Sequence, residues 1–438
     1  MINRFSKRFG SDNGLYPVKP GIVGALDVGS TKVACFIAKA DGARAPGQRN
    51  LRVLGIGHQI SRGVRAGTVV DMDGAEEAIR AAVEQAERMA GLTLRDAVIG
   101  IACGQPSSKT IKVEVSIAGH EVGEQDLRHA HQYGREQIPF GDREVIHCTP
   151  GSYSIDGSRG IRDPRGMYGE RLGVSMHLVT AAQSPIRNLE TCVERCHLDV
   201  AGKVAVPYAS GLATLSGDEM DLGVTVLDMG GGTTSISVFF DGSLILADVL
   251  PVGGNHITTD LARGLSTTLS HAERMKTLYG SALSSPHDGQ EMMAVPHIGE
   301  EDPEAVSHLP RSVLTGIIQP RLEETFELVR DRLQDSGLES IAGRRVVLTG
   351  GASQLNGARE IAARILSKQV RLGRPARLNG LAEATGGGAF STCAGLALWA
   401  ANRPSEMLGN GDAEDDVPRQ AYGTYGLAGI GRWFRDNF

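Results

Sequence analysis

The chain has 438 residues, of which 41% are hydrophobic and 22% are charged, a composition typical of a folded globular protein. This length exceeds what one hydrophobic core usually supports and predicts about two to four domains. The net charge of −6 excludes a protein that binds nucleic acid through overall positive charge, and no stretch of the sequence approaches the roughly 20 apolar residues of a membrane span. Residues 1–19 are basic without an apolar core, so we expect a flexible tail rather than a signal peptide.

The first strongly patterned stretch is residues 24–37. An apolar run ends in Asp27, a short turn follows, and a second apolar run begins at Lys32. This pattern predicts a β-hairpin whose turn carries backbone N–H groups and hydroxyls. The turn residues are Gly29, Ser30 and Thr31.

A strand and a long helix are predicted next. Residues 51–59 alternate weakly as a strand, and residues 71–90 place small or apolar residues at helical spacing. Asp71 or Asp73 is suited to cap this helix, and Gly91 is suited to end it.

The character of the sequence changes over residues 105–178. This block contains several predicted strands and one predicted helix, residues 124–135, but no turn of the glycine-rich kind. Two short strands are expected at residues 144–148 and 151–155. We interpret the block as a small inserted α+β module.

The second hairpin, residues 222–239, follows a predicted strand at 200–206 and a small-residue helix at 207–215. It repeats the design of the first hairpin, with Asp228 at the end of its first strand. Its turn contains Gly230, Gly231, Gly232, Thr233 and Thr234.

The repetition of this turn is the most informative feature of the sequence. Glycines let backbone N–H groups approach an anion closely, and Asp228 is suited to hold a hydrated Mg²⁺. Either turn alone is equally compatible with an ordinary tight hairpin. Two copies, each with an aspartate at the strand end, predict two similar halves that face each other across a cleft.

The remaining elements are predicted mainly as helices. Residues 281–310 are polar and contain Pro and Gly, so we expect irregular structure there. Helices are expected at 257–265, 270–279, 312–333, 356–366 and 391–401, and strands at 244–252, 345–348 and 375–378.

The C-terminal segment is predicted to be a linker followed by an amphipathic helix. Residues 404–425 are polar and acidic, which favours disorder, and one helical stripe of residues 426–438 is apolar with flanking arginines. This pattern is typical of a helix that lies in a membrane interface, and a helix docked on the body is the alternative. The residues concerned are Leu427, Ile430, Arg432, Trp433, Phe434, Arg435 and Phe438.

The six cysteines predict a reducing environment. Most lie in apolar runs, which is typical of buried thiols. Cys192 and Cys196 lie four residues apart beside His197, but the sequence has no second pair to complete a metal site, so a structural role is expected.

The order of the motifs resembles the actin, sugar-kinase and heat-shock-chaperone ATPase superfamily. Two Leu-Asp-x-Gly turns are followed by Gly253-Gly254, a Glu-x-x-Lys helix and a third turn at Gly350-Gly351. The insertion, with its strand RLGVSMHLVTA, and the C-terminal helix are similar to those of the FtsA family of bacterial cell-division proteins. The resemblance implies an α/β, actin-like fold: two duplicated ribonuclease-H-like halves around a nucleotide cleft, with an inserted α+β module.

The resemblance also implies ATP with Mg²⁺ in that cleft. The metal would lie near Asp27 and Asp228 and be held mainly through water and phosphate oxygens. The residues expected to bind the nucleotide are Asp27, Gly29, Ser30, Thr31, Lys32, Asp228, Gly230, Gly231, Gly232, Thr233, Thr234, Gly254, Glu273, Lys276, Gly350, Gly351, Ala352 and Leu355.

Four subdomains are implied, named 1A, 1C, 2A and 2B in that family. Subdomain 1A would comprise 20–104 and 179–214, 1C the insertion 105–178, 2A the segments 215–256 and 331–385, and 2B residues 257–330. Residues 386–403 would form a helix that returns to 1A.

The implied function is an ATP-binding protein that polymerises on the cytoplasmic side of the inner membrane at the division septum. It would anchor filaments of the tubulin-like protein FtsZ by binding their C-terminal peptide on 2B, with Arg311 and Arg321 as candidate contacts. The insertion would recruit later division proteins, and the C-terminal helix would bind lipid. No nucleic-acid partner is expected.

One departure from actin-like ATPases concerns hydrolysis. Those proteins place Gln or Glu near the start of the helix after strand 200–206 to orient water, whereas residues 204–209 here read VAVPYA. Because phosphoryl transfer depends on such positioning, we expect weak or undetectable hydrolysis and assign no catalytic residue. A sugar-kinase-like or pilus-assembly-type member of the same superfamily is the alternative.

Overall fold

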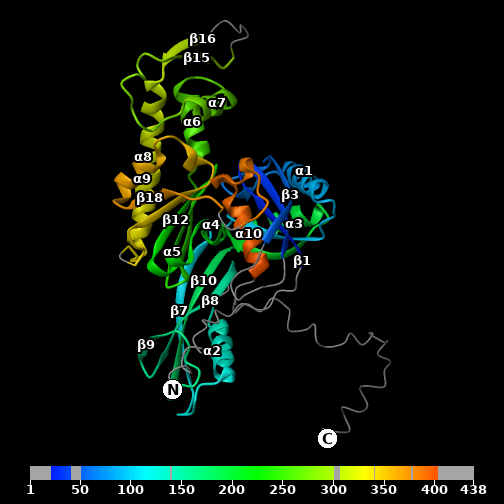
Figure 1. Cartoon of the computed structure of the whole chain (residues 1–438), viewed down its shortest axis with the longest axis vertical. Coiled ribbons are helices and arrows are strands. Elements are labelled where there is room, and N and C mark those ends of the chain that lie inside the picture. Colours follow the sequence, from blue (N-terminus) through cyan, green and yellow to red (C-terminus); the bar gives the residue numbers. More distant parts are fainter. Residues whose placement is uncertain are drawn as a thin grey trace, which may run out of the picture.

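The computed structural model describes residues 21–40, 51–138, 141–299, 306–339, 341–375 and 378–402. The molecule is elongated, as Figure 1 shows. A hairpin of β15 (Met292–Pro296) and β16 (Val306–Pro310) lies at one end, and the insertion lies at the other, with helix α2 (Glu124–Glu136) at its edge (Figure 1).

The first half is built on a five-stranded sheet in the order β11-β6-β1-β2-β3. The two strands of the first hairpin pair antiparallel with Asp27 opposite Ala34, and β6 pairs parallel with β1. The strands are β1 (Gly21–Val28), β2 (Lys32–Ala40), β3 (Leu51–Ile60), β6 (Asp96–Ile101) and β11 (Asp199–Ala205), and a short pair β4 (Val64–Arg65) and β5 (Thr68–Val69) lies in the loop that follows β3.

Helices cover both faces of this sheet. Helix α1 (Met72–Ala90) packs so closely on β3 that a Cβ at Gly57 would collide with the Ala82 carbonyl. Gly57 pairs with Cys35, so the next residue of β2, Phe36, faces the opposite side and stacks on Phe390. That opposite side is covered by α10 (Ser391–Asn402), which also packs on α4 (Val206–Thr214), whereas α3 (Gln183–Arg195) packs on α1.

The second half repeats this topology. Its strands follow the order β18-β17-β12-β13-β14, and the relations match those of the first half: β12 pairs antiparallel with β13 and parallel with β17. The strands are β12 (Val224–Met229), β13 (Thr234–Phe240), β14 (Ser243–Leu250), β17 (Arg345–Thr349) and β18 (Gln369–Leu372). The predicted duplication is confirmed.

The insertion extends the sheet of the second half, although it branches from the first half. After β14 the same sheet continues as β7-β10-β8-β9, and α2 packs on β7 and β10 over a separate hydrophobic core. The predicted division into two strands, 144–148 and 151–155, is wrong, because a bulge between Pro150 and Tyr153, opposite Ser175, lets one strand continue. The strands are β7 (Ser107–Ser116), β8 (Arg143–Ile155), β9 (Ser158–Ile161) and β10 (Arg171–Ala182).

Helices α6 (Gly254–Gly264) and α7 (Leu269–Tyr279) lie between the sheet of the second half and the β15–β16 hairpin (Figure 1). Helix α8 (Ser312–Asp335) packs on α6 and on α9 (Ala358–Leu366), and α9 packs on β18, whereas α5 (Gly217–Leu222) packs on β13. β15 and β16 lie within the segment expected to be irregular, so that expectation is wrong. β18 was not predicted, and the strand expected at residues 375–378 lies partly outside the described residues. The missed strands alternate or lie half exposed and therefore lack a continuous apolar run.

The predicted linker and C-terminal helix, residues 404–438, lie outside the described residues, as does the N-terminal tail. Among the described residues, no helix has both the length and the apolar character needed to cross a membrane.

Candidate functional site

The turns of the two duplicated hairpins meet at a cavity of about 160 Å³ between the halves. They touch each other: a Cβ on Gly231 would collide with the Thr31 side chain, and one on Gly232 would collide with the Ser30 hydroxyl. Glycine at both positions is what allows this approach. The cavity is lined by Asp27, Val28, Gly29, Ser30, Thr31, Lys32, Gly67, Ala102, Val206, Asp228, Gly230, Gly231, Gly232, Thr233, Ser235, Gly350, Gly351, Ala389 and Thr392.

Both turns are closed by the same hydrogen bond. The N–H of Gly29 donates to the Lys32 carbonyl, and the N–H of Gly230 donates to the Thr233 carbonyl, each at 2.9 Å. Within the described part of the chain, the remaining turn N–H groups have no hydrogen-bond acceptor: those of Ser30, Thr31, Gly231, Gly232 and Thr233. The residues that carry these unpaired donors line one cavity, which suits an anion with several oxygen atoms, and a nucleotide polyphosphate fits this requirement.

Two carboxylates and one ammonium group form the floor of the cavity. Burial raises the pKa of Asp27 from 3.8 to about 6, Lys32 opposes this shift, and Asp228 adds to it. Burial likewise lowers the pKa of Lys32. The Lys32 ammonium donates to the Ala389 carbonyl and lies 3.4 Å from the centre of the Phe390 ring.

Asp228 is held by helices from both sides. The Thr392 hydroxyl of α10 donates to its Oδ2 at 2.8 Å, and Ser210 of α4 also hydrogen-bonds to it. Burial raises the pKa of Asp228, and these hydrogen bonds and Lys32 oppose that shift. Two buried carboxylates with a single ammonium group nearby suit a hydrated divalent cation, which would relieve their repulsion.

The third glycine turn closes the cavity on the side of the second half. Gly350 and Gly351 line the cavity, and Gly350 has φ +88° beside Asp228, so a Cβ there would collide with the carboxylate. Ala352 and Leu355 do not line it. A Cβ on Gly254 would lie 3.1 Å from the Cβ of Ala352, which places the start of α6 against this turn.

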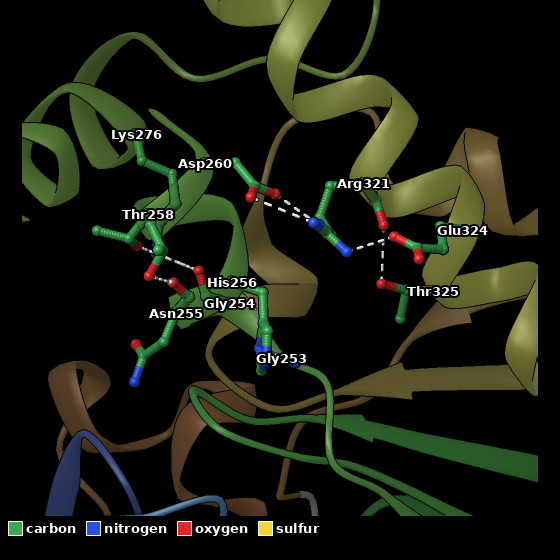
Figure 2. Close-up of polar contacts among 11 residues, drawn as sticks. Gly253, Gly254, Asn255, His256, Thr258, Asp260, Lys276, Arg321, Glu324 and Thr325 are labelled. Atoms are coloured by element: carbon green, nitrogen blue, oxygen red, sulfur yellow. Dashed lines mark hydrogen bonds and ion pairs between the residues drawn. The ribbon is translucent and has the colours of Figure 1, made fainter. Parts of the chain in front are cut away.

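The residues expected around the nucleoside form a cluster beside the cavity. Lys276 of α7 lies beside Gly254 and Thr258 (Figure 2), and it donates to the Gly254 carbonyl at 3.2 Å and to the Thr258 hydroxyl at 2.8 Å. It also pairs with Glu273 at 2.6 Å. The structure thus brings Gly254, Glu273 and Lys276 together, but none of them lines the cavity.

Thr234 also lies apart from the cavity. It is fully buried, and its hydroxyl donates to the Val252 carbonyl at 2.8 Å. This bond joins the end of the second turn to the segment that precedes α6.

Several residues that line the cavity were missed from the sequence. Thr392 at the start of α10 and Ala389 in the turn that precedes it are far from both hairpins in the chain, so no local spacing reveals them. A signal did exist in Gly386-Gly387-Gly388, a further glycine run before a small-residue helix. The other missed residues are Val28, Gly67, Ala102, Val206 and Ser235.

The two arginines proposed as partner contacts both lie on or beside α8. Arg321 forms a bidentate pair with Asp260 of α6, at 2.5 and 3.2 Å, and also contacts Glu324 (Figure 2). Arg311 lies at the start of α8 and pairs with Glu291 at 3.0 Å. A second hollow of about 250 Å³ lies beside Arg321 and is lined by Asp260, Gly316, Ile317, Pro320, Arg321 and Glu324.

Comparisons with solved structures identify the fold. The chain is similar to a chain of the PilM–PilN type IV pilus biogenesis complex, with a TM-score of 0.59, 16% identity, and coverage of 87% of this chain and 99% of that one. It is also similar to MreB 5 of Spiroplasma citri bound to AMPPNP, with a TM-score of 0.51, 11% identity, and coverage of 87% and 96%. These likenesses confirm the actin-like fold.

Sequence comparisons identify the family. The family model "Cell division protein FtsA" matches residues 225–395, and the model "SHS2 domain inserted in FTSA" matches residues 103–180. Cell division protein FtsA of Rhizobium meliloti (strain 1021) is 45% identical over 98% of this chain and 99% of its own. The Pseudomonas aeruginosa protein of the same name is 34% identical over 95% and 98%, and that of Escherichia coli (strain K12) is 31% identical over 94% and 96%. The chain therefore belongs to the FtsA family of cell division proteins.

Proposed function

We propose that the cavity binds ATP with Mg²⁺, and that the nucleotide-bound chain polymerises on the cytoplasmic side of the inner membrane, where it anchors FtsZ filaments at the septum. The observation that carries the proposal is the pair of facing turns, whose unpaired N–H groups converge on one cavity beside two buried carboxylates. A solved relative in fold, MreB 5 of Spiroplasma citri, holds AMPPNP.

The roles proposed for the residues follow from their chemistry. The turn that contains Ser30 and the turn that contains Gly231 hold the phosphates from two sides with backbone N–H groups. Asp27 and Asp228 orient the water ligands of Mg²⁺. The Gly350 turn, with Ala352 and Leu355, lies against adenosine, and Gly254, Glu273 and Lys276 bound the nucleoside.

Nucleotide binding is tested with Gly231→Ala, whose new Cβ would displace Thr31 and narrow the cavity. Gly289→Ala is the matched control, since a Cβ there meets nothing within 4 Å. We expect a fluorescent ATP analogue to bind the unmodified chain and the control in the presence of Mg²⁺, and to bind Gly231→Ala at least about ten-fold more weakly, a loss of about 1.4 kcal/mol. Equal affinity of all three proteins contradicts the assignment.

Hydrolysis is proposed to be weak or absent. The cavity wall at the start of α4 is the aliphatic side chain of Val206, and Asp27 and Asp228 are the only carboxylates among the described residues that line the cavity. With no Gln or Glu to orient water, binding serves mainly to set the conformation of the chain. Phosphate release at the rate of actin filaments, measured on vesicle-bound protein, contradicts this.

Membrane attachment is proposed for the C-terminal helix, residues 426–438. Its apolar stripe, which includes Trp433 and Phe434, suits an interfacial helix. Full-length protein is expected to co-sediment with vesicles that contain anionic lipid, and a version that ends at Pro418 is expected to stay in the supernatant. Lipid binding by the truncated version refutes this role.

The FtsZ peptide is proposed to bind the 2B subdomain near Arg311 and Arg321. The side chains of both arginines are about a quarter exposed, at 26% and 28%, and an acidic peptide would compete for them with the carboxylates with which they pair. Arg311→Glu is expected to weaken binding of that peptide in fluorescence anisotropy, whereas Arg330→Glu, a change on α8 at a side chain that is 39% exposed, is not. Unchanged affinity for Arg311→Glu contradicts the contact.

The division into subdomains 1A, 1C, 2A and 2B, with the bounds expected from the sequence, remains part of this proposal. So does recruitment of later division proteins through residues 105–178.

A further inference from the structure

The insertion contacts the wall of the nucleotide cavity through one buried histidine. His147 lies on β8, within the insertion, and only 1% of its surface is exposed. Its Nε2 accepts a hydrogen bond from the backbone N–H of Ala205 at 2.9 Å. Because Nε2 accepts this bond, the neutral ring carries its proton on Nδ1.

Ala205 lies where the first half meets the cavity. It is the last residue of β11 and precedes α4, and the next residue, Val206, lines the cavity. One turn further along α4, Ser210 hydrogen-bonds to Asp228. A displacement of the β11–α4 junction would therefore move both Val206 in the cavity wall and Ser210, which hydrogen-bonds to Asp228.

The ring of His147 also packs on the two helices that carry cavity residues. It meets Tyr208 of α4 edge to face, with ring centres 5.1 Å apart, and Trp399 of α10 at 6.3 Å. α10 supplies Thr392, which donates to Asp228. One side chain of the insertion thus contacts both elements that hold this carboxylate.

We propose that His147 is a positioning residue that couples the insertion to the nucleotide cavity through the Ala205–Val206 junction. Nucleotide in the cavity then changes the mobility of the insertion. If nucleotide changes the affinity of the insertion for a protein partner, then by linkage that partner changes nucleotide affinity by the same factor. The proposal rests on the nucleotide site proposed above.

Three variants separate coupling from simple packing. His147→Phe keeps a ring between the two helices but removes the acceptor, whereas His147→Gln keeps an oxygen near the position of Nε2. His177→Phe is the matched control: His177 lies diagonal to His147 on the same face of the β8–β10 pair and is 5% exposed. Neither of its ring nitrogens has a hydrogen-bond partner in the described part of the chain, and burial lowers its pKa to about 4.

The experiment measures amide hydrogen exchange of β7 and β8 in the full chain, with and without saturating Mg²⁺ and ATP. The dissociation constant of each variant is determined first, so that saturation is known. We expect ATP to slow exchange in these strands several-fold in the unmodified chain, in His147→Gln and in His177→Phe. In His147→Phe the effect of ATP on these strands is lost while ATP still binds.

Two results overturn the coupling: a nucleotide effect retained in His147→Phe, or none in the unmodified chain that demonstrably binds ATP. The second result needs no variant, so it decides the matter even if His147→Phe fails to fold. Absence of ATP binding by the unmodified chain is a different outcome, because it removes the proposed nucleotide site itself.

Discussion

Gly350 occupies a position in the site that only glycine fits. Its backbone is in the left-handed region, with φ +88°, and the space that a side chain would need is taken by the Asp228 carboxylate. No other residue type satisfies both constraints without displacing the carboxylate. The backbone of this turn can therefore lie close to the nucleotide proposed to bind in the cavity.

Gly350→Ala tests this with a matched control. Gly91→Ala introduces the same left-handed alanine, φ +69°, at the end of α1, where a Cβ meets nothing within 4 Å. We expect Gly91→Ala to lower the free energy of unfolding by about 1 kcal/mol. Gly350→Ala is expected to cost more and to weaken ATP binding, as measured by urea denaturation and nucleotide titration. Equal losses of stability would show that the collision with Asp228 is relieved without cost.

Asp27 gives a pH dependence whose sign follows from its burial. Its pKa in the folded chain is about 6, above 3.8 for the unconstrained carboxyl, so the nucleotide-free folded state binds more protons between these values. The contribution of Asp27 to stability is fully present below pH 3.8 and is lost as pH rises through about 6.

The free energy of unfolding of Asp27→Asn is therefore expected to rise relative to that of the unmodified chain as pH increases from about 4 to about 6. Above about pH 7 the difference between the two proteins is expected to be constant. Thermal unfolding of both proteins across this range, without Mg²⁺ or nucleotide, measures it. A difference that is constant throughout the range would mean that Asp27 titrates as an exposed carboxyl does. Adding Mg²⁺ and ATP should suppress the dependence, because the bound cation favours the charged carboxylate.

At the scale of single elements, α1 illustrates which parts of the fold its local sequence determines. Of the two aspartates suited to cap it, Asp71 does so: its side chain accepts from the Gly74 N–H, and Gly91 ends the helix in the left-handed conformation. Asp73 lies in the first turn, where it faces the positive end of the helix dipole.

Asp71→Ala is expected to lower the free energy of unfolding by about 1 kcal/mol, because one N–H at the helix start loses its acceptor. Asp73→Ala removes only a favourable charge and is expected to cost about 0.5 kcal/mol or less. Urea denaturation of both variants gives the comparison. Equal losses of unfolding free energy in the two variants would show that the charge of Asp71, and not its hydrogen bond to the Gly74 N–H, stabilises the helix.

The elements that the sequence predicted well are those with strong local patterns. Both hairpins, α1 and α8 were predicted within a few residues because apolar periodicity and turn residues agree there. β18 was missed because it is an exposed edge strand, Gln369–Leu372, without an apolar run, and its pairing with β17 depends on distant residues. The cavity was anticipated from its two turns, whereas Thr392 and Val206 reach it only through tertiary packing.

At the scale of the whole molecule, the cavity lies between two halves that both supply turns to it, so bound nucleotide is expected to hold them together. Polymerisation would then present many C-terminal helices to one membrane. The helix proposed for residues 426–438 would bury Trp433 and Phe434, which contributes only about a few kcal/mol, so one such helix would be a weak anchor alone. Several helices on one polymer bind collectively.

Vesicle binding of the full chain is therefore expected to rise more steeply with protein concentration when Mg²⁺ and ATP are present than when they are absent. Co-sedimentation at a series of concentrations measures the two curves, and the version that ends at Pro418 controls for polymers that sediment without lipid. Identical curves with and without nucleotide would separate membrane attachment from the nucleotide site.

The pairing of β14 with β7 bears on solubility. In the second half β7 pairs with β14 at one position, Asp248 with Ser107, and the Ala247 N–H donates to the Ser108 hydroxyl at 2.8 Å. An uncovered edge strand offers its N–H and C=O groups to strands of other chains. A version of the chain without the insertion would lose this pairing at one end of β14, and we expect the newly exposed edge to promote aggregation.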